Sequence, residues 1–356
     1  MFLFDAHLDL AMNAMEWNRD LRLPVSVSRE REKNMTDQPD RQKGTVAFPE
    51  LRQANIGLVV ATQIARYAAP GHPLPGWHSP EQAWAQTQAQ LSWYRCMEAA
   101  GELTAITDKT ALEKHLAAWM QKDADGMNLP IGYVRSLEGA DSLVTLHYLH
   151  QAYEQGLRAV GPAHYGPGRY ASGTDASAPL SDNGKALLRE MESLNMLLDV
   201  SHLCDLAFFE ALDIYKGPLW ASHSNPRSLV PHNRQISDEM IRLLIERDSA
   251  IGIALDAWML VPNWERGLSQ PAAMQCTLDT VVQHIDYVCQ LAGNSLHVGI
   301  GSDLDGAFGT EQCPADLNTI ADLPKIKALL FDKGYREEDC ANIFYKNFLR
   351  ILRKSL

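Results

Sequence analysis

The sequence predicts an α/β fold, a (β/α)8 TIM barrel, and three observations lead to this prediction. Apolar stretches of strand length recur along the 356 residues, and most are separated by a segment of helix length. Strands that alternate with helices form parallel sheets, and eight such units in a chain of this length fit one barrel. No strand is followed by a glycine-rich dinucleotide or P-loop motif. The predicted strands are residues 2–9, 58–62, 131–139, 156–164, 196–202, 218–223, 250–256 and 296–303.

The helices between these strands have their own sequence signals. A helix beginning at Thr110 is predicted from Thr-x-x-Glu113, which has the spacing of a capping box. Ser181 is expected to cap another helix, and a further one should stop near Gly293. The last fifty residues are interpreted as closing helices, so we expect one domain over residues 1–356. The remaining helix predictions are residues 80–99, 181–195, 208–212, 237–246 and 281–288.

Two long connections follow the first two strands. Residues 13–44 carry many charges and few apolar side chains, and connections of this length are usually lids or binding loops. We therefore predict a lid segment at 13–44. The second connection, residues 66–78, is rich in proline and glycine, which is typical of a loop. His72 and His78 are interpreted as loop histidines in preference to metal ligands.

The composition argues against several classes of protein. Apolar residues make up 46% and charged residues 21% of the chain, as in an ordinary globular protein. The net charge of −12 is spread without basic blocks, which argues against nucleic acid as a partner. No apolar run approaches the roughly 20 residues that span a membrane. The six cysteines lack metal-binding spacing, and the first residues lack a secretory signal, so we expect reduced thiols and a cytoplasmic protein.

Side chains that bind metals recur where the predicted strands end. His7 and Asp9 stand two residues apart in a strand, so they project from the same face. The carboxyl ends of barrel strands converge at one mouth, where such folds keep their chemistry. Four imidazoles and three carboxylates in one mouth fit a divalent metal better than any alternative. The set is His7, Asp9, Glu138, His164, His202, His223 and Asp303.

Roles unrelated to metal binding fit this set of residues less well. Each one alone could be a helix cap, a turn residue or a buried hydrogen-bonded side chain, but their joint occurrence at strand ends favours a metal site. Ser201 and Ser222 each precede a histidine, yet the chain lacks the G-x-S-x-G elbow of a serine hydrolase. The stretch from Asp303 to Gly306 begins like a calcium-binding loop but lacks the remaining ligand spacing.

Five short motifs occur in a fixed order along the chain. They are Asp5-Ala6-His7-Leu8-Asp9-Leu10, Ser136-Leu137-Glu138-Gly139, Leu198-Asp199-Val200-Ser201-His202, Ser222-His223-Ser224 and Gly301-Ser302-Asp303-Leu304-Asp305-Gly306. With them the chain resembles the membrane (renal) dipeptidase family, peptidases of the amidohydrolase superfamily with a binuclear zinc centre in a (β/α)8 barrel. The similarity extends from Asp5 to about Leu352, and residues 342–350 are similar to the closing helix of the family.

The resemblance implies the metal ligands. His7 and Asp9 would hold one Zn²⁺ ion, Glu138 would bridge two, and His202 and His223 would hold the second. Two cations that share a carboxylate lower the pKa of a bound water into the neutral range, and the resulting hydroxide can attack an amide carbonyl. Sites of histidine and carboxylate also accept Mn, Co or Fe, so other divalent metals are open.

The resemblance also implies how a substrate is handled. Asp303 would lie by the first metal, accept the proton of the attacking water and pass it to the leaving nitrogen. His164 would polarise the substrate carbonyl, a role worth roughly 3–4 kcal/mol for one well-placed donor. Arg234 would bind the terminal carboxylate with its planar fork. The implied activity is hydrolysis of small dipeptides, including those with a D-residue at the carboxyl end, and a homodimer is expected by analogy with relatives.

The sequence departs from the family pattern at a few positions. Ala6 and Leu8 stand where the family commonly has Gly and Asn. Asp256-Ala257-Trp258 replaces an Asn followed by aromatic residues that include Tyr. The added carboxylate and the missing phenol leave the preferred substrate side chain open. Two alternatives follow: a metal-dependent amidohydrolase that acts on a lactone or an N-acyl amino acid, and a non-catalytic barrel used for binding.

Overall fold

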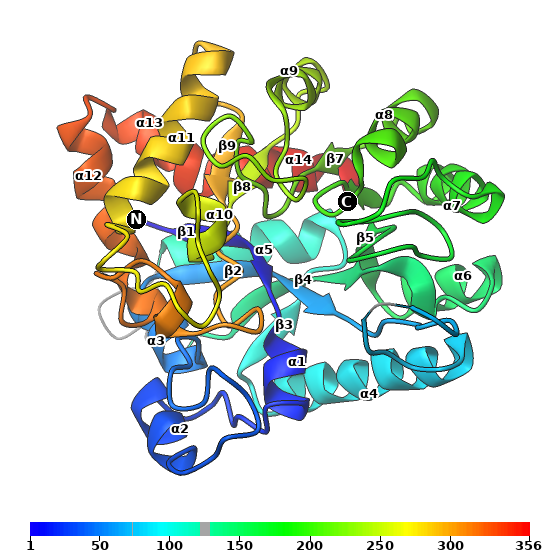
Figure 1. Cartoon of the computed structure of the whole chain (residues 1–356), viewed down its shortest axis with the longest axis horizontal. Helices are drawn as coiled ribbons and strands as arrows, with labels where there is room; N and C mark the ends of the chain where they lie inside the picture. Colours follow the sequence, from blue (N-terminus) through cyan, green and yellow to red (C-terminus); the bar gives the residue numbers. More distant parts are fainter. Residues whose placement is uncertain (73, 122–128) are drawn as a thin grey trace.

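The computed structural model describes residues 1–72, 74–121 and 129–356. Its parallel strands follow one another in the sheet in chain order, and the helices lie around them (Figure 1). The predicted (β/α)8 barrel is therefore confirmed. The barrel strands are β1 (Leu3–Leu8), β2 (Ile56–Gln63), β4 (Ile131–Glu138), β5 (Leu157–Gly161), β6 (Leu197–Asp199), β7 (Leu219–Trp220), β8 (Ile251–Ile253) and β9 (Val298–Ile300).

The sheet closes between β7 and β8 through a single parallel bridge. The backbone N–H of Ala221 donates to the carbonyl of Ala250 at 3.0 Å, and the N–H of Gly252 donates to the carbonyl of Ala221 at 2.8 Å. The backbones approach closely at this point, because a Cβ atom on Gly252 would lie 1.9 Å from the carbonyl oxygen of Ser222. Only glycine fits there, so the residue type at this position lets the barrel close.

The observed strands differ from the predicted ones in number and length. A short strand, β3 (Leu103–Ala105), pairs with the start of β4 and had no counterpart among the predicted strands. The last five barrel strands end several residues before the predicted bounds. Apolar patterning extends past the paired residues because the segments after each strand are also buried, and burial alone does not show where pairing stops.

Helices cover the outside of the barrel, and polar caps define several of their starts. Ser181 accepts a hydrogen bond from the N–H of Gly184, as predicted. The capping box at Thr110 was wrong: α5 begins at Lys109, and Asp108 caps it by accepting from the N–H of Ala111 at 2.8 Å. The helices are α1 (Leu10–Met15), α2 (Val25–Arg31), α3 (Phe48–Gln53), α4 (Pro80–Ala99), α5 (Lys109–Met120), α6 (Leu146–Glu154), α7 (Asp182–Ser193), α8 (Asp205–Ile214), α9 (Asp238–Glu246), α10 (Ala257–Leu260), α11 (Leu278–Ala292), α12 (Ile326–Asp332), α13 (Glu337–Ala341) and α14 (Asn347–Ser355).

The segment 13–44 contains the end of α1, the helix α2 and irregular connections, drawn in blue at the lower left of Figure 1. Its centre is a buried arginine, Arg19, which forms ion pairs with Glu32 at 2.7 Å and Asp40 at 3.0 Å. Arg19 also lies 3.6 Å from Asp305, in the loop after β9. Buried charge pairs therefore fix this polar segment to the barrel.

The closing helices predicted for the last fifty residues are present. Phe348 of α14 packs edge-on against Phe4 of β1, with ring centroids 5.8 Å apart, and against Trp220 of β7 at 5.6 Å. These contacts join the end of the chain to its first strand and to the closure region of the barrel. Among the described residues, no helix is both long and apolar enough to cross a membrane.

Candidate metal centre

The predicted site residues occupy a repeated position in the fold. His7 lies within β1, and Glu138 is the last residue of β4. Four others stand three residues after the last residue of their strand, where pairing has stopped and the chain turns across the barrel mouth. These four are His164 after β5, His202 after β6, His223 after β7 and Asp303 after β9.

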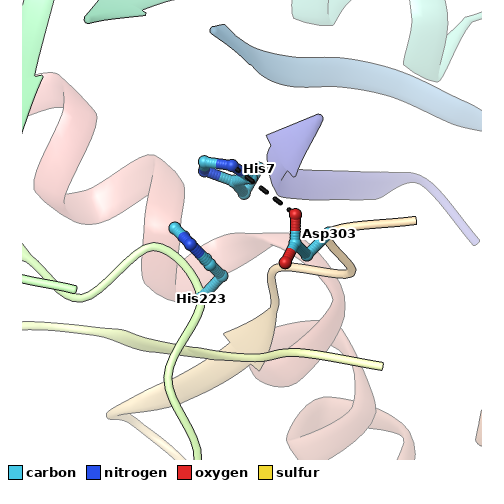
Figure 2. Close-up of side chains that lie close together, drawn as sticks. All are labelled: His7, His223 and Asp303. Carbon is cyan, nitrogen blue, oxygen red and sulfur yellow. Dashed lines mark ion pairs between the residues drawn. The ribbon is translucent and has the colours of Figure 1, made fainter. Parts of the chain in front are cut away.

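One group of side chains gathers around Nε2 of His7. This nitrogen lies 3.8 Å from Oδ1 of Asp9, 3.6 Å from Oε2 of Glu138 and 3.8 Å from Oδ1 of Asp303. Figure 2 shows Asp303 pointing toward His7, with His223 beside it; the centroids of the two imidazole rings are 3.7 Å apart. Nε2 of His7 is buried and has no hydrogen-bond partner among the described residues.

A second group gathers around the other oxygen of Glu138. Oε1 of Glu138 lies 3.1 Å from Nε2 of His202 and 3.4 Å from Nε2 of His223. The two imidazole nitrogens are 3.0 Å apart. Nε2 of His164 is 3.8 Å from the same oxygen. Facing imidazole nitrogens beside a carboxylate, next to an orphaned Nε2 on His7, are a donor set suited to divalent cations.

Burial and charge shift the protonation of these side chains in different directions. Burial alone would lower the pKa of His7, but Glu138 and Asp9 outweigh it and raise that pKa to about 10. Burial, and then the charge of Glu138, raise the pKa of Asp9 to about 7. Several neighbouring carboxylates therefore stabilise a positive charge next to His7. Burial lowers the pKa of His202 and of His223 well below the usual range, so both are neutral, as metal-binding imidazoles have to be.

Buried polar groups behind the site orient these side chains. The hydroxyl of Ser222 lies 2.8 Å from Nδ1 of His223 and 3.3 Å from Nδ1 of His7. The hydroxyl of Thr174 lies 3.3 Å from Nδ1 of His202. Thr62, at the end of β2, donates a short hydrogen bond to Asp9. Because Ser222 is fully buried, its contact with His223 orients an imidazole and cannot present a nucleophile to a substrate.

Asp303 and His164 lie at the open side of the site. Both side chains are 17% exposed, whereas the other five histidine and carboxylate side chains of the set are almost fully buried. Burial, partly offset by His7 and assisted by the neighbouring carboxylates, raises the pKa of Asp303 well above its usual value. A substrate can therefore reach Asp303 and His164 while the more deeply placed groups stay in the interior.

Arg234 reaches the site from the loop between β7 and α9. Its guanidinium donates to the carbonyls of Ser201 and His223, both at 2.9 Å, and lies 3.2 Å from Nε2 of His202. Arg234 is 3% exposed. The nitrogen of His202 that faces Arg234 also faces Glu138, and a lone pair donated to a cation is not available to Arg234. The carbonyls of Ser201 and His223 hold Arg234 independently of His202.

The structure accounts for the unusual residues after β8. Asp256 follows this strand, and its carboxylate accepts hydrogen bonds from Gln312 at 2.8 Å, Trp258 at 2.5 Å and Arg266 at 3.1 Å. Burial raises the pKa of Asp256 to about 6. The added carboxylate is thus held by neighbouring donors.

The loop after β2 contributes no histidine to the metal centre. Neither His72 nor His78 belongs to the metal-binding groups found among the described residues. Both lie in the connection between β2 and α4, so their predicted position in a loop is confirmed.

Two residues near the site had no role in the sequence prediction. Arg66 contacts His164, and Thr62 contacts Asp9. Thr62 lies in β2 and Arg66 three residues after its end, the same spacing as His202 after β6. The position of Arg66 relative to its strand was the available signal, but residues 66–78 were interpreted only as a loop.

A barrel with histidines and carboxylates grouped at the carboxyl ends of its strands defines the class of metal-dependent hydrolases with a (β/α)8 fold. Within this class, residues 1–355 match the family described as membrane dipeptidase, peptidase family M19. The chain belongs to this family of metallopeptidases. The resemblance found from its motifs is therefore confirmed.

Individual relatives support the same family. The chain is 30% identical over 213 residues to an uncharacterized protein from the pqqA 5′ region of Klebsiella pneumoniae, which covers 58% of this chain and 74% of that protein. It is 30% identical over 231 residues to the dipeptidase tcpJ of Claviceps purpurea, which covers 63% of this chain and 51% of the fungal protein. The chain thus aligns with about half the length of this second relative.

A solved structure has the same fold over its whole length. It is a metallo peptidase from Rhodobacter sphaeroides, liganded with a phosphinate mimic of the dipeptide L-Ala-D-Ala. The TM-score is 0.79 at 22% sequence identity, covering 100% of this chain and 99% of that chain. This likeness establishes the shared barrel.

Proposed function

We propose that the chain is a binuclear, zinc-dependent dipeptidase that hydrolyses the peptide bond of small dipeptides, including those with a D-residue at the carboxyl end. One observation carries the proposal: the two oxygens of Glu138 face different imidazoles. Oε2 lies 3.6 Å from Nε2 of His7, and Oε1 lies 3.1 and 3.4 Å from Nε2 of His202 and His223. A carboxylate in this position is suited to bridge two cations.

The assigned ligands follow from this division. His7, Asp9 and Glu138 would hold one cation, with Asp303 nearby, and Glu138, His202 and His223 would hold the other. Two bound cations would acidify a shared water molecule and so supply a nucleophile at neutral pH. Burial keeps His202 and His223 in the neutral form that coordinates metals. At His7, Glu138 and Asp9 outweigh burial and raise the pKa to about 10, so a cation would have to displace its proton.

The remaining groups act on the substrate. His164, at the open side, donates a hydrogen bond to the carbonyl oxygen as negative charge develops there. Asp303 accepts the proton released by the attacking water and returns one to the leaving nitrogen, which keeps the proton count balanced. Arg234 pairs with the free carboxylate of the dipeptide. The dipeptide mimic bound by the Rhodobacter sphaeroides relative supports a substrate of this size.

Metal reconstitution combined with a substrate panel tests the proposal. The purified chain is stripped with a chelator, reloaded with Zn²⁺, Mn²⁺ or Co²⁺, and analysed for metal per chain and for hydrolysis. We expect two metals per chain and turnover of dipeptides with free termini, with both stereoisomers compared at each position. Turnover of lactones or N-acyl amino acids alone would favour the amidohydrolase alternative. If the protein binds no metal and shows no turnover even after Zn²⁺ is added, the result would favour the alternative of a non-catalytic barrel used for binding.

A matched pair of variants separates metal loss from misfolding. Glu138→Gln keeps the size of the bridging side chain but removes its charge, so we expect less than two metals per chain and loss of turnover. Glu113→Gln, on the exposed side of α5, is the control and should keep both. The cytoplasmic location and the homodimer expected from the sequence stay predictions.

A further inference from the structure

We propose that Arg66 is a positioning residue that holds His164 as a neutral imidazole with its proton on Nε2 and keeps His164 out of the metal ligand set. This inference rests on the proposed function for the role of His164 toward a substrate. Its starting point is one contact: Nη2 of Arg66 lies 2.7 Å from Nδ1 of His164. Both residues stand three positions after a barrel strand, β2 and β5.

The chemistry of the two groups fixes the direction of this hydrogen bond. A guanidinium has five N–H donors and no acceptor, and it stays protonated in proteins. Nδ1 of His164 therefore has to accept. A neutral imidazole carries one proton, so that proton is on Nε2, the nitrogen that faces Glu138 at 3.8 Å. Nε2 of His164 is then a hydrogen-bond donor, as a group that stabilises a developing oxyanion must be.

The same chemistry separates His164 from the histidines proposed as ligands. An imidazole that coordinates a metal through Nε2 carries its proton on Nδ1 and needs an acceptor there. Nδ1 of His202 faces the hydroxyl of Thr174, and Nδ1 of His223 faces the hydroxyl of Ser222. Hydroxyl oxygens can accept. His164 lies in a group that could hold a metal with Glu138 and His202, but its Nδ1 faces a donor.

Arg66 is itself held in place by the loop that follows β2. Its Nη1 donates to the carbonyl of Pro75 at 2.9 Å, and its backbone carbonyl accepts from the N–H of Trp77 at 2.8 Å. In the described part of the chain, no carboxylate forms an ion pair with Arg66, and its Nε has no hydrogen-bond partner. Direct contacts therefore hold Arg66 between Pro75 and His164, while the charges of Glu138 and Asp141 act on it from a greater distance.

Nitrogen-15 NMR of the histidine rings tests the inference directly. The protein is labelled at its histidines and loaded with Zn²⁺, and the His164→Gln variant identifies the signals of His164. We expect the Nε2–H form in the unsubstituted protein. Arg66→Met should mix the two tautomers, and Arg66→Lys, which keeps a cationic donor, should restore Nε2–H. An Nδ1–H form of His164 in the unsubstituted protein would overturn the proposal, whatever the variants do.

The Co²⁺-loaded protein gives a second readout that does not depend on turnover. Releasing His164 in Arg66→Met should allow it to enter the metal site, so we expect a changed visible spectrum. For dipeptide hydrolysis we expect kcat to fall roughly 10- to 100-fold, as for other residues that orient site groups, with a smaller change in KM. A fall confined to KM, or an unchanged spectrum and tautomer, would remove Arg66 from this role.

The control is Arg158→Met, another half-buried arginine that donates to backbone carbonyls, those of Thr107 and Tyr153 among them. It should leave the tautomer of His164, the cobalt spectrum and kcat unchanged. If the protein hydrolyses no dipeptide at all, the proposed function fails, but the NMR and the cobalt spectrum still decide the role of Arg66.

Discussion

Glu138 ends β4, and its carboxylate lies among four imidazoles, one from β1 and three from the segments after β5, β6 and β7. Its two oxygens face His7 on one side and His202 with His223 on the other. At the scale of single residues, the character of each histidine depends on the partner of its second nitrogen. Hydroxyl groups stand behind His202 and His223, and a guanidinium stands behind His164. A histidine can thus be suited to bind a metal or to donate a hydrogen bond, depending on the group that contacts its Nδ1.

The side chain of Arg234 should contribute to substrate affinity. We expect Arg234→Lys to raise KM for dipeptides roughly 10- to 100-fold, because a hydrogen bond to a charged group is worth about 1.5–3 kcal/mol. Metal content should not change, as measured by elemental analysis. Arg227→Lys, in the same loop but paired with Asp205, is the control. An equal loss for amidated dipeptides, which lack the carboxylate, would contradict the assignment.

A buried histidine outside the candidate metal-binding groups should make stability depend on pH. Burial lowers the pKa of His284, on α11, to about 4. The folded state therefore resists protonation, so His284 contributes stability above its unfolded pKa of about 6.5, and this is lost as pH falls toward 4. The lost contribution is about 3 kcal/mol from the pKa difference.

Denaturant unfolding from pH 7 to 4.5 measures this effect. His284→Gln keeps a donor for the carbonyl of Leu260, which His284 contacts at 3.0 Å, and removes the titration. The variant should lose less stability on acidification than the unsubstituted chain. His147→Gln, at an exposed position on α6, should behave like the unsubstituted chain. Identical pH profiles for both variants would show that His284 does not titrate in this range.

At the scale of secondary-structure elements, the mouth of the barrel is formed by short strands and by the long segments that follow them. The strands from β5 onward end early, and the residues that follow turn inward with their polar side chains. Helix starts are set by local capping instead. For α5 the cap is Asp108, one residue before the helix, although Thr110 matched a sequence pattern for the same task. Asp108 accepts from the N–H of Ala111, so Thr110 lies inside the first turn.

Replacing the two candidate caps distinguishes them. Asp108→Ala should lower the free energy of unfolding by about 1 kcal/mol, the usual value for loss of a capping side chain. Thr110→Ala should change it by less than about 0.5 kcal/mol, because an exposed side chain without a capping role contributes little. Urea unfolding followed by circular dichroism measures both. A larger loss of unfolding free energy in Thr110→Ala than in Asp108→Ala would show that Thr110 is the capping residue.

At the scale of the whole molecule, buried charges join the polar segment 13–44 to the loop after β9. Arg19 pairs with Glu32 and Asp40 and approaches Asp305, whose carboxylate also accepts from the backbone N–H groups of Thr45 and Val46. Asp305 lies two residues after Asp303. Segment 13–44 is therefore linked to Asp303 through Asp305 and the short stretch of main chain that joins these two residues. The lid role of 13–44 and the single domain over 1–356 remain predictions.

Removing the central arginine tests how firmly this segment is held. Arg19→Met leaves Asp40 buried without an ion-pair partner among the described residues and leaves Glu32 with Arg41 alone, which should cost about 3–5 kcal/mol of unfolding free energy. Arg22→Met removes an arginine whose exposed pair with Asp20 is worth less than about 1 kcal/mol. Hydrogen exchange over residues 13–44 should accelerate only in Arg19→Met. Equal exchange in both variants would show that Arg19 does not fix the segment.

The amino-acid sequence by itself determined the barrel, the family and the set of strand-end histidines and carboxylates. Apolar patterning and motif order are local properties, so they can be read along the chain. Tertiary structure decided which oxygen of Glu138 faces which imidazole, where each strand stops, and that Arg66 stands behind His164. These features depend on contacts between residues separated by many positions, such as the 98 positions between Arg66 and His164, and no local pattern specifies such distances.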